Sequence, residues 1–342
     1  MLAESKKVVR QILDQSIATV ATHRWSKPAG SLLILAYHRV LPASFRDLDI
    51  VEPGMFVYTS TFEAHLQMLR QDFDIVCLSD WLRARAQGHT QPKRACAITF
   101  DDGWRDNFEF AFPLLKKYEA PATIFVVAGM AGTTKQFWPE RLARILRHAS
   151  DLDVGQPGAG ITWVEQLLID TQIPRKELTS CQISELIKIA KQWSDEQISQ
   201  YLDDVESKIE RLPPLQEPDV LDWTQLRQMA ATGLISVGSH TTNHIRLTSD
   251  VDSKTVHQEV VGSKALIEQE LSAPVDLFCY PNGDVSKDAE QVVSQTYIGA
   301  CTTEFGWNRP NADSCRLRRI TIHEGRTHSK SAFLARISGW LG

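Results

Sequence analysis

Two adjacent carboxylates, Asp101 and Asp102, directly follow an apolar, strand-like run of residues. Far along the chain, a second apolar run is followed by His240 and His244, two imidazoles at four-residue spacing. One Asp and two His are a ligand set for a divalent metal ion that keeps coordination positions open for water and substrate. Such an ion can activate water, and the spare carboxylate can then act as its base. The pattern therefore indicates a metal-dependent hydrolase.

Each half of this pattern also has a simpler interpretation. Adjacent Asp residues in a turn are commonly capping or solvated groups, and a His-x-x-x-His pair can lie on a surface. Two neighbouring carboxylates repel each other, and both stay charged at low cost only if a cation lies close to them. This favours the interpretation as a metal site. If residues 240–244 form a helical turn, both imidazoles can reach one ion, because side chains at i and i+4 share a face. Thr241 could orient a neighbouring ligand.

Four apolar runs that could position these groups share one arrangement: polar residues follow directly at the carboxyl end of each. Apolar runs at residues 32–36, 96–100, 234–238 and 275–279 each end in polar or ionisable residues. These are Tyr37, His38 and Arg39 after the first run, the Asp pair after the second, the His pair after the third, and Tyr280 and Asn282 after the fourth. In a parallel barrel all strand carboxyl ends open on one face, so we expect these groups to converge.

Strand-like runs alternate with helical patterns, which predicts an α/β protein with a parallel sheet. Seven or eight strands favour a barrel over an open sheet. The predicted strands cover residues 32–36, 74–78, 96–100, 122–127, 234–238, 275–280, 297–302 and 317–322. The predicted helices cover residues 60–71, 79–86, 113–118, 223–232, 252–271 and 286–296. Pro113 suits a first helical turn, and Ser60 and Ser79 suit N-caps.

A charged, helical stretch interrupts this rhythm at residues 135–221 and lacks any strand pattern. We interpret it as an insertion on the barrel rim, either a spacer or a lid that shapes the substrate cleft. The predicted organisation is an N-terminal amphipathic helix (1–29), a first barrel segment (30–134), the insertion (135–221) and a second barrel segment (222–342). The helix could dock on its own domain, or residues 1–22 could contact a membrane surface or a partner.

Composition narrows the class of protein and its location. With 342 residues, of which 43% are hydrophobic, the chain can bury a sizeable core, and a net charge of −5 gives no case for nucleic-acid binding. The sequence lacks an eighteen-residue apolar run and a secretory signal. Its six cysteines have no disulfide or zinc-ribbon spacing, which fits a reducing compartment. We therefore expect a cytoplasmic protein, or one peripheral on the inner face of a membrane.

The motifs resemble those of a known family. Residues 99–103 (TFDDG) and 240–244 (HTTNH) look like the first two signature motifs of the polysaccharide deacetylases, the NodB-homology group of carbohydrate esterase family 4. Residues 35–40 (LAYHRV) and 278–283 (FCYPNG) resemble an exopolysaccharide-biosynthesis branch of that family. The resemblance covers roughly residues 30–130 and 222–325 and leaves the helical insertion outside.

This resemblance implies a distorted (β/α)7-8 barrel that removes N-acetyl groups from amino sugars in a metal-dependent reaction. By similarity, Asp101 would be the general base, and Asp102, His240 and His244 would hold the metal. The ion would be Zn²⁺, with Co²⁺ or Ni²⁺ as substitutes. The backbone N–H of Asn282 would stabilise the oxyanion, at a position where many relatives carry Tyr.

Two departures from the family pattern leave roles open. Many relatives carry an arginine near the base in the third motif. In this chain either Phe278 or Cys279 corresponds to that arginine position. Arg318 or Arg319 could supply that charge from another strand. The late motif that holds an acidic histidine is indistinct, and His323 is one candidate for it. In permuted relatives the histidine of the N-terminal Tyr-His motif is the general acid, which favours His38.

Substrate contacts and the reaction itself have alternatives. Tyr280 and Trp104 are candidates for substrate binding, although most tryptophans are simply buried. The expected substrate is an N-acetylated glycan or a sugar–lipid precursor. A metal-dependent amidohydrolase acting on a non-sugar C–N bond, or a glycan-binding pseudoenzyme, would share the fold. The sequence leaves the sugar, its linkage and the oligomeric state open.

Overall fold

The computed structural model of the chain describes residues 14–16, 28–45, 48, 51–52, 54–147, 163–171, 178–208 and 218–339. The chain divides into two compact units. The first comprises residues 1–42, 56–133 and 219–342, and the second comprises residues 43–55 and 134–218. The amphipathic helix predicted over residues 1–29 lies outside the described residues except for residues 14–16, which are helical, and residues 28–29, which are not. None of the described helices is long and apolar enough to span a bilayer.

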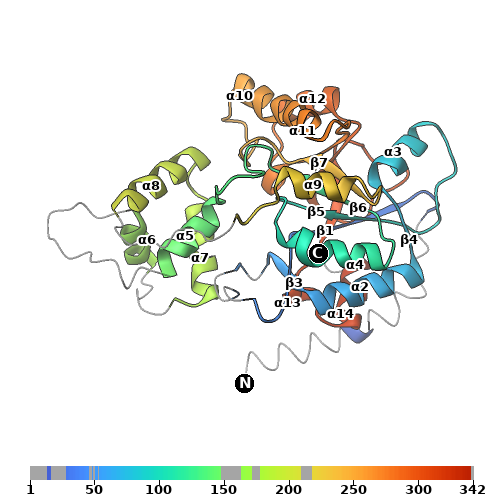
Figure 1. The fold of residues 1–342 in the computed structure, drawn as a ribbon, viewed down its shortest axis with the longest axis horizontal. Helices are drawn as coiled ribbons and strands as arrows, with labels where there is room; N and C mark the ends of the chain where they lie inside the picture. Colours follow the sequence, from blue (N-terminus) through green and yellow to red (C-terminus); the bar gives the residue numbers. More distant parts are fainter. Residues whose placement is uncertain are drawn as a thin grey trace. The chain divides into compact units, whose positions relative to one another are not determined.

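The first unit is built on a closed barrel of seven parallel strands (Figure 1). Around the barrel the order is β1-β10-β9-β8-β7-β6-β5, and β5 pairs back with β1 to close it. The strands are β1 (Leu32–Tyr37), β5 (Ala95–Phe100), β6 (Ala122–Val126), β7 (Ile235–Ser239), β8 (Leu277–Cys279), β9 (Gly299–Phe305) and β10 (Leu317–Thr321). The predicted α/β barrel is therefore confirmed. Near-continuous apolar strands suit it because both faces of each strand are covered.

Two short strand pairings accompany the barrel. β4 (Asp74–Ile75) pairs with the first two residues of β5, and β2 (Arg39–Leu41) pairs with β3 (Phe56–Tyr58) in a separate sheet. The strand predicted for residues 74–78 is therefore mostly wrong, because helix α3 begins at Leu78.

Helices surround the strands in Figure 1. They are α2 (Thr59–Asp72), α3 (Leu78–Ala86), α4 (Phe112–Lys117), α9 (Trp223–Ala230), α10 (Ser253–His257), α11 (Ser263–Leu271), α12 (Lys287–Thr296), α13 (Glu324–Thr327) and α14 (Lys330–Ile337). The π-helical turn η1 (Asn107–Ala111) directly precedes α4, and a second one, η2 (Gln258–Gly262), lies between α10 and α11. The short helix η3 (Pro281–Gly283) is a 3₁₀ turn. Pro113 lies in the first turn of α4, as predicted.

Neither predicted serine N-cap is correct. The cap positions are Tyr58 for α2 and Cys77 for α3, and neither side chain caps its helix. Near the start of α2, Glu324 of α13 accepts hydrogen bonds from the Tyr58 N–H and the Thr61 hydroxyl. A contact from a residue more than 260 positions away thus ties this end of the helix to α13.

Strand alternation divides the buried side chains of the barrel into two sets. Leu33 and Leu35 face the surrounding helices, whereas Leu32 and Ile34 face the barrel interior. Trp81 of α3 belongs to the interior cluster. Because inward-facing positions recur every second residue, the same parity decides which polar side chains at the strand ends point into the barrel.

The second unit is helical in its described residues, which contain no strand. Its helices are α5 (Trp138–Arg147), α6 (Trp163–Thr171), α7 (Ser180–Ala190) and α8 (Asp195–Lys208). Each contributes to a separate apolar core, with Leu142, Leu167, Leu186 and Leu202 among its members. The bounds predicted for the insertion and its role as a lid or a spacer stay predictions.

Candidate functional site

The carboxyl ends of the barrel strands bring the predicted ligands together. β5 and β1 pair along their full length, so Asp101 follows β5 on the rim where His38 follows β1. His240 follows directly after β7. Ligand atoms of Asp102, His240 and His244 all lie within 4.8 Å of one another. The expected convergence of groups that are more than 130 residues apart in sequence is therefore observed.

The distances from Asp102 to the two imidazoles suit ligands of one metal ion. Asp102 Oδ1 lies 3.5 Å from His240 Nε2 and 3.3 Å from His244 Nε2. With metal–ligand bonds of about 2.0–2.1 Å, the edge of a tetrahedral site measures about 3.3 Å. Charged N–H···O hydrogen bonds would be shorter, at roughly 2.7–2.9 Å. Both the donor set and its spacing therefore suit a small divalent ion.

A backbone carbonyl orients His240 for this role. His240 is 3% exposed, and its Nδ1 lies 2.7 Å from the carbonyl oxygen of Cys279. A carbonyl oxygen only accepts, so Nδ1 carries a proton and Nε2 is the nitrogen that faces Asp102 and could bind a metal. A hydrogen bond of this kind to the remote nitrogen is the usual support of a metal-binding histidine.

The segment from His240 to His244 is a loop and not the helical turn considered above. Thr241 and His244 have φ angles of 65° and 59°, in the left-handed region that such residues rarely adopt. Buried Glu259 holds the loop by accepting hydrogen bonds from the backbone N–H groups of Thr242 and Asn243 at 2.9 and 2.8 Å. Left-handed residues concentrated at one site are typical of functional loops.

Thr241 and Glu259 both support this loop from outside the ligand set. The Thr241 hydroxyl accepts a hydrogen bond from the His244 N–H at 2.9 Å, as the sequence analysis anticipated. Glu259 was missed. It lies in η2, and its partners are 16 and 17 residues away, so no local pattern marks it. A π-helical turn at this position accords with the frequent occurrence of such turns near functional sites.

The second carboxylate, Asp101, is paired with Arg319. Arg319 Nη1 and Nη2 donate to Asp101 Oδ1 and Oδ2 at 2.6 and 2.7 Å, and both side chains are at most 5% exposed. Of the two arginines considered, Arg319 therefore lies at the base, while Arg318 is 55% exposed and pairs with Glu304. Arg319 is two residues after inward-facing Leu317 in the same strand, so its side chain also points inward, whereas that of Arg318 points outward. This alternation is the sequence signal that could have distinguished the two arginines.

Arg319 also excludes a second metal site. Asp101, His240 and Cys279 form another group of ligand atoms within 4.8 Å of one another. The guanidinium already lies among them, donating to Cys279 Sγ at 3.0 Å as well as to Asp101. Burial raises the pKa of the Cys279 thiol well above its usual value, so the thiol is protonated. A second cation at this point would meet both the arginine charge and a neutral sulfur.

The two neighbouring carboxylates are ionised by different partners. Burial disfavours the charged form of both. The guanidinium of Arg319 outweighs that burial and lowers the pKa of Asp101. The imidazoles of His240 and His244 outweigh it at Asp102, and hold its pKa well below the usual range. The site therefore presents two buried carboxylates, one facing a permanent cation and the other facing the metal position.

His38 lies beside Asp101, with its Nε2 3.9 Å from Asp101 Oδ2. Asn107 donates to the backbone carbonyl of His38 at 2.8 Å and so fixes the rim of β1. The rival histidine, His323, follows β10 and is the N-cap residue of α13. His38 is thus in reach of the candidate base.

Two of the predicted substrate-binding side chains are buried. Trp104 is 1% exposed, so its ring cannot stack on a sugar; its Nε1–H donates instead to Asp102 Oδ2 at 2.9 Å. Tyr280 is fully buried and packs on Phe278 in the layer facing the helices. Because adjacent residues of a strand point to opposite sides, the inward direction of Cys279 turns Tyr280 away from the ligands.

Asn282 is the remaining predicted residue. It is exposed in the turn after β8, with a φ angle of 55°. Its side-chain amide donates to Asp284, and its carbonyl oxygen accepts from the Thr303 hydroxyl at 3.3 Å. These contacts fix the turn and involve no residue of the metal ligand set, so the role of its backbone N–H stays a prediction.

Solved structures share the fold. IcaB from Ammonifex degensii superposes with a TM-score of 0.57 at 18% identity, covering 91% of this chain and 98% of that one. The Streptococcus pyogenes deacetylase PplD gives a TM-score of 0.56 at 18% identity, covering 87% of this chain and 95% of that one. At this level of identity the likeness concerns the fold.

Two curated relatives match part of the sequence. YxkH of Bacillus subtilis is 27% identical over 155 residues, which are 44% of this chain and 52% of that protein. The poly-β-1,6-N-acetyl-D-glucosamine N-deacetylase of Staphylococcus aureus is 36% identical over 111 residues, 30% of this chain and 38% of that protein. The chain thus spans about half, or less, of the length of these relatives.

The family described as polysaccharide deacetylase matches residues 88–155 and 179–299, more than half of the chain. The matched segments include β5 with its Asp pair and β7 with the loop that carries the His pair. The motifs, the closed barrel and this match agree, and the chain belongs to the polysaccharide deacetylase family.

Proposed function

We propose that this protein is a metal-dependent hydrolase that removes N-acetyl groups from an amino-sugar polysaccharide or a sugar–lipid precursor. One observation carries the proposal: Asp102 Oδ1 lies 3.3 and 3.5 Å from two imidazole nitrogens, while the adjacent Asp101 is paired with Arg319. The N-acetylglucosamine polymer named for the Staphylococcus aureus relatives supports this substrate class.

Asp102, His240 and His244 would hold the ion, with Zn²⁺ the first choice and Co²⁺ or Ni²⁺ as substitutes. Their mixed N/O donor set suits any of these ions. Three protein ligands leave a position open, as in catalytic rather than structural zinc sites. When bound, the ion would polarise the acetamide carbonyl and lower the pKa of a water molecule toward neutrality.

Asp101 would accept the proton of the attacking water. Its charge is kept by Arg319, whose two N–H groups occupy one face of the carboxylate and leave lone pairs on both oxygens. The backbone N–H of Asn282 would donate to the oxyanion that develops on the carbonyl oxygen. As the C–N bond breaks, His38 would donate a proton to the leaving amine, which gives acetate and a free amino sugar.

Release of acetate tests this proposal against the two alternatives. Purified protein loaded with Zn²⁺ is incubated with N-acetylglucosamine oligomers and, separately, with small cyclic amides. Metal-stimulated acetate release from the oligomers, abolished by a chelator, is the expected result. Hydrolysis confined to the cyclic amides would identify a non-sugar amidohydrolase. Binding of the oligomers without hydrolysis would identify a glycan-binding pseudoenzyme.

We further propose a peripheral membrane contact through residues 1–22, on the strength of the amphipathic sequence pattern. Co-sedimentation with anionic liposomes, comparing the full chain with one lacking these residues, tests it. Equal sedimentation of the two proteins would refute the contact.

A further inference from the structure

The two oxygens of Asp102 have separate partners. Oδ1 faces the imidazoles of His240 and His244, whereas Oδ2 accepts a hydrogen bond from Trp104 Nε1–H at 2.9 Å. Trp104 is 1% exposed, so this indole N–H cannot turn to water for another acceptor. One oxygen of the carboxylate is thus directed to the metal position and the other is held by a buried donor.

A buried ion pair fixes the indole in place. The guanidinium of Arg39 lies 4.4 Å from the centre of the Trp104 ring. Arg39 Nε in turn donates to Asp106 Oδ2 at 2.8 Å, and Asp106 Oδ1 accepts from the Val40 N–H at 2.9 Å. Arg39 and Asp106 are 8% and 4% exposed. Desolvated cation–π contacts of this kind are stronger than exposed ones, and the pair is anchored to the backbone at Val40.

We propose that Trp104 is a positioning residue that restricts Asp102 to one-oxygen coordination of the metal. The indole N–H holds Oδ2 in its present orientation, so binding of the ion by both oxygens would require the carboxylate to turn and would weaken this buried hydrogen bond. The indole thereby keeps a coordination position open for water and the acetyl oxygen. This inference rests on the proposed function, because it requires a metal at Asp102.

The test compares two buried tryptophans that differ in their N–H contacts. Trp104→Phe removes the donor to Asp102 and keeps an aromatic ring. Trp81→Phe is the matched control: Trp81 is 3% exposed, has the guanidinium of Arg85 5.1 Å from its ring, and has no hydrogen-bond partner for its Nε1 among the described residues. Zn²⁺ affinity is measured by competition with a chromophoric chelator, and geometry by the visible absorption of the Co²⁺-loaded protein.

We expect Trp104→Phe to weaken Zn²⁺ binding by about 10- to 100-fold, the usual effect of removing a partner of a metal ligand. The Co²⁺ absorption should also lose intensity, because a second carboxylate oxygen raises the coordination number. Trp81→Phe should change neither reading. Wild-type affinity and an unaltered Co²⁺ spectrum in Trp104→Phe would overturn the inference.

Further variants separate this inference from the metal site itself. His244→Ala should lose Zn²⁺ binding; if it binds with wild-type affinity, the proposed site fails, whatever Trp104 does. If His244→Ala loses the ion while Trp104→Phe keeps it unchanged, only the positioning role fails. Should Trp104→Phe not fold, Asp106→Asn decides, since it loosens Arg39 over the indole. Weaker Zn²⁺ binding in Asp106→Asn supports the role, and unchanged binding refutes it.

Discussion

Arg319 donates from its two terminal nitrogens to the two oxygens of Asp101, at 2.6 and 2.7 Å, in the interior of the barrel. The same guanidinium is anchored by the carbonyl oxygen of Thr302 and the hydroxyl of Thr99. This arrangement explains how adjacent carboxylates coexist in a buried site: a fixed cation compensates one of them, and the imidazoles and the metal position compensate the other. It also places an arginine at the base from β10, in a chain whose third motif lacks one.

Replacing the base should separate catalysis from metal binding. In Asp101→Asn we expect acetate release to fall by roughly 100- to 10,000-fold, because the amide cannot accept the water proton. One Zn²⁺ per chain should still bind, since Asp102, His240 and His244 are unchanged. Activity is followed by acetate release and metal content by atomic absorption. Substantial turnover in this variant would remove Asp101 from the role of base.

Removing the guanidinium of Arg319 should lower both the stability and the activity of the protein. Arg319→Met leaves Asp101 buried without its partner, so the free energy of unfolding of the metal-free protein should fall by about 3–5 kcal/mol in urea titrations. The pKa of Asp101 should rise, which moves the acidic limb of the kcat/KM profile to higher pH. The neighbouring Arg318→Met is the control. Its side chain is 55% exposed, and its ion pair should contribute about 0–1 kcal/mol. Equal effects of the two changes would contradict the account.

The general acid can be assigned by a pair of variants. His38 lies 3.9 Å from Asp101, so His38→Ala should reduce kcat by roughly 100-fold or more while KM changes little. His323→Ala should behave nearly as the wild type in steady-state assays. A normal rate in His38→Ala together with a large loss in His323→Ala would move the acid role to His323.

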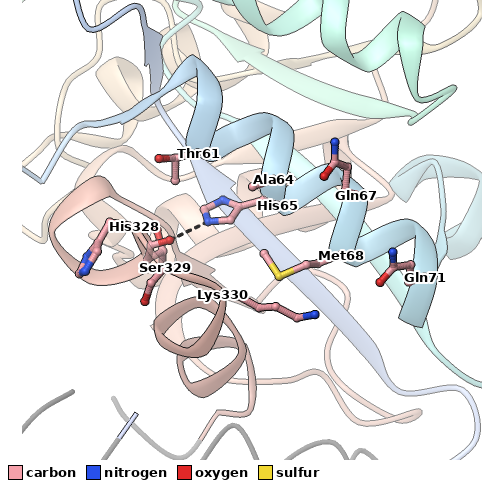
Figure 2. A pocket seen from close by; sticks show the side chains of 10 residues that line it. Thr61, Ala64, His65, Gln67, Met68, Gln71, His328, Ser329 and Lys330 are labelled. Carbon is pink, nitrogen blue, oxygen red and sulfur yellow. Dashed lines mark hydrogen bonds between the residues drawn. The ribbon is translucent and has the colours of Figure 1, made fainter. Parts of the chain in front are cut away.

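A buried histidine outside the site predicts a pH-dependent stability. His65 of α2 donates through Nε2 to the Thr327 carbonyl oxygen, the dashed line at His65 in Figure 2. Its ring also contacts the hydroxyl of Tyr37 in β1 and stacks on Phe333 of α14. Burial lowers its pKa to about 4. The unfolded chain, with a His pKa of about 6.5, binds more protons between these values, so the free energy of unfolding should fall by about 3 kcal/mol as the pH drops from 7 to 4.

Urea unfolding across this range measures that contribution. His65→Gln should be less stable at pH 7 but should lose this part of the pH dependence, because it has no proton to bind. His89→Gln changes an exposed histidine and should leave the slope as it is in the wild type. The same slope in His65→Gln as in the wild type would show that other groups cause it.

The barrel and the gathering of Asp102, His240 and His244 could be predicted because their signals are local. Apolar runs ended in polar residues at Asp101 and His240, and parallel strands place such ends on one rim. The loop conformation could not be read in this way. Thr241 and His244 adopt positive φ angles because Glu259, distant in sequence, accepts the backbone N–H groups between them.

The direction of individual side chains was the second feature that the sequence pattern did not predict. Tyr280 follows an inward-facing residue and therefore points to the helices, so its place near the motif did not bring it to the site. Trp104 follows the Asp pair closely, yet its ring is buried and only its N–H meets Asp102. A motif identifies which residues gather at a rim, whereas parity and backbone angles decide which atoms face one another.

Anomalous diffraction at the zinc edge, from crystals soaked with Zn²⁺ and acetate, tests the central claim most directly. The account predicts one strong peak about 2.0–2.1 Å from Asp102 Oδ1, His240 Nε2 and His244 Nε2, with Asp101 still paired to Arg319 and outside the coordination shell. A zinc ion bound by Asp101, or a peak remote from both histidines, would contradict it.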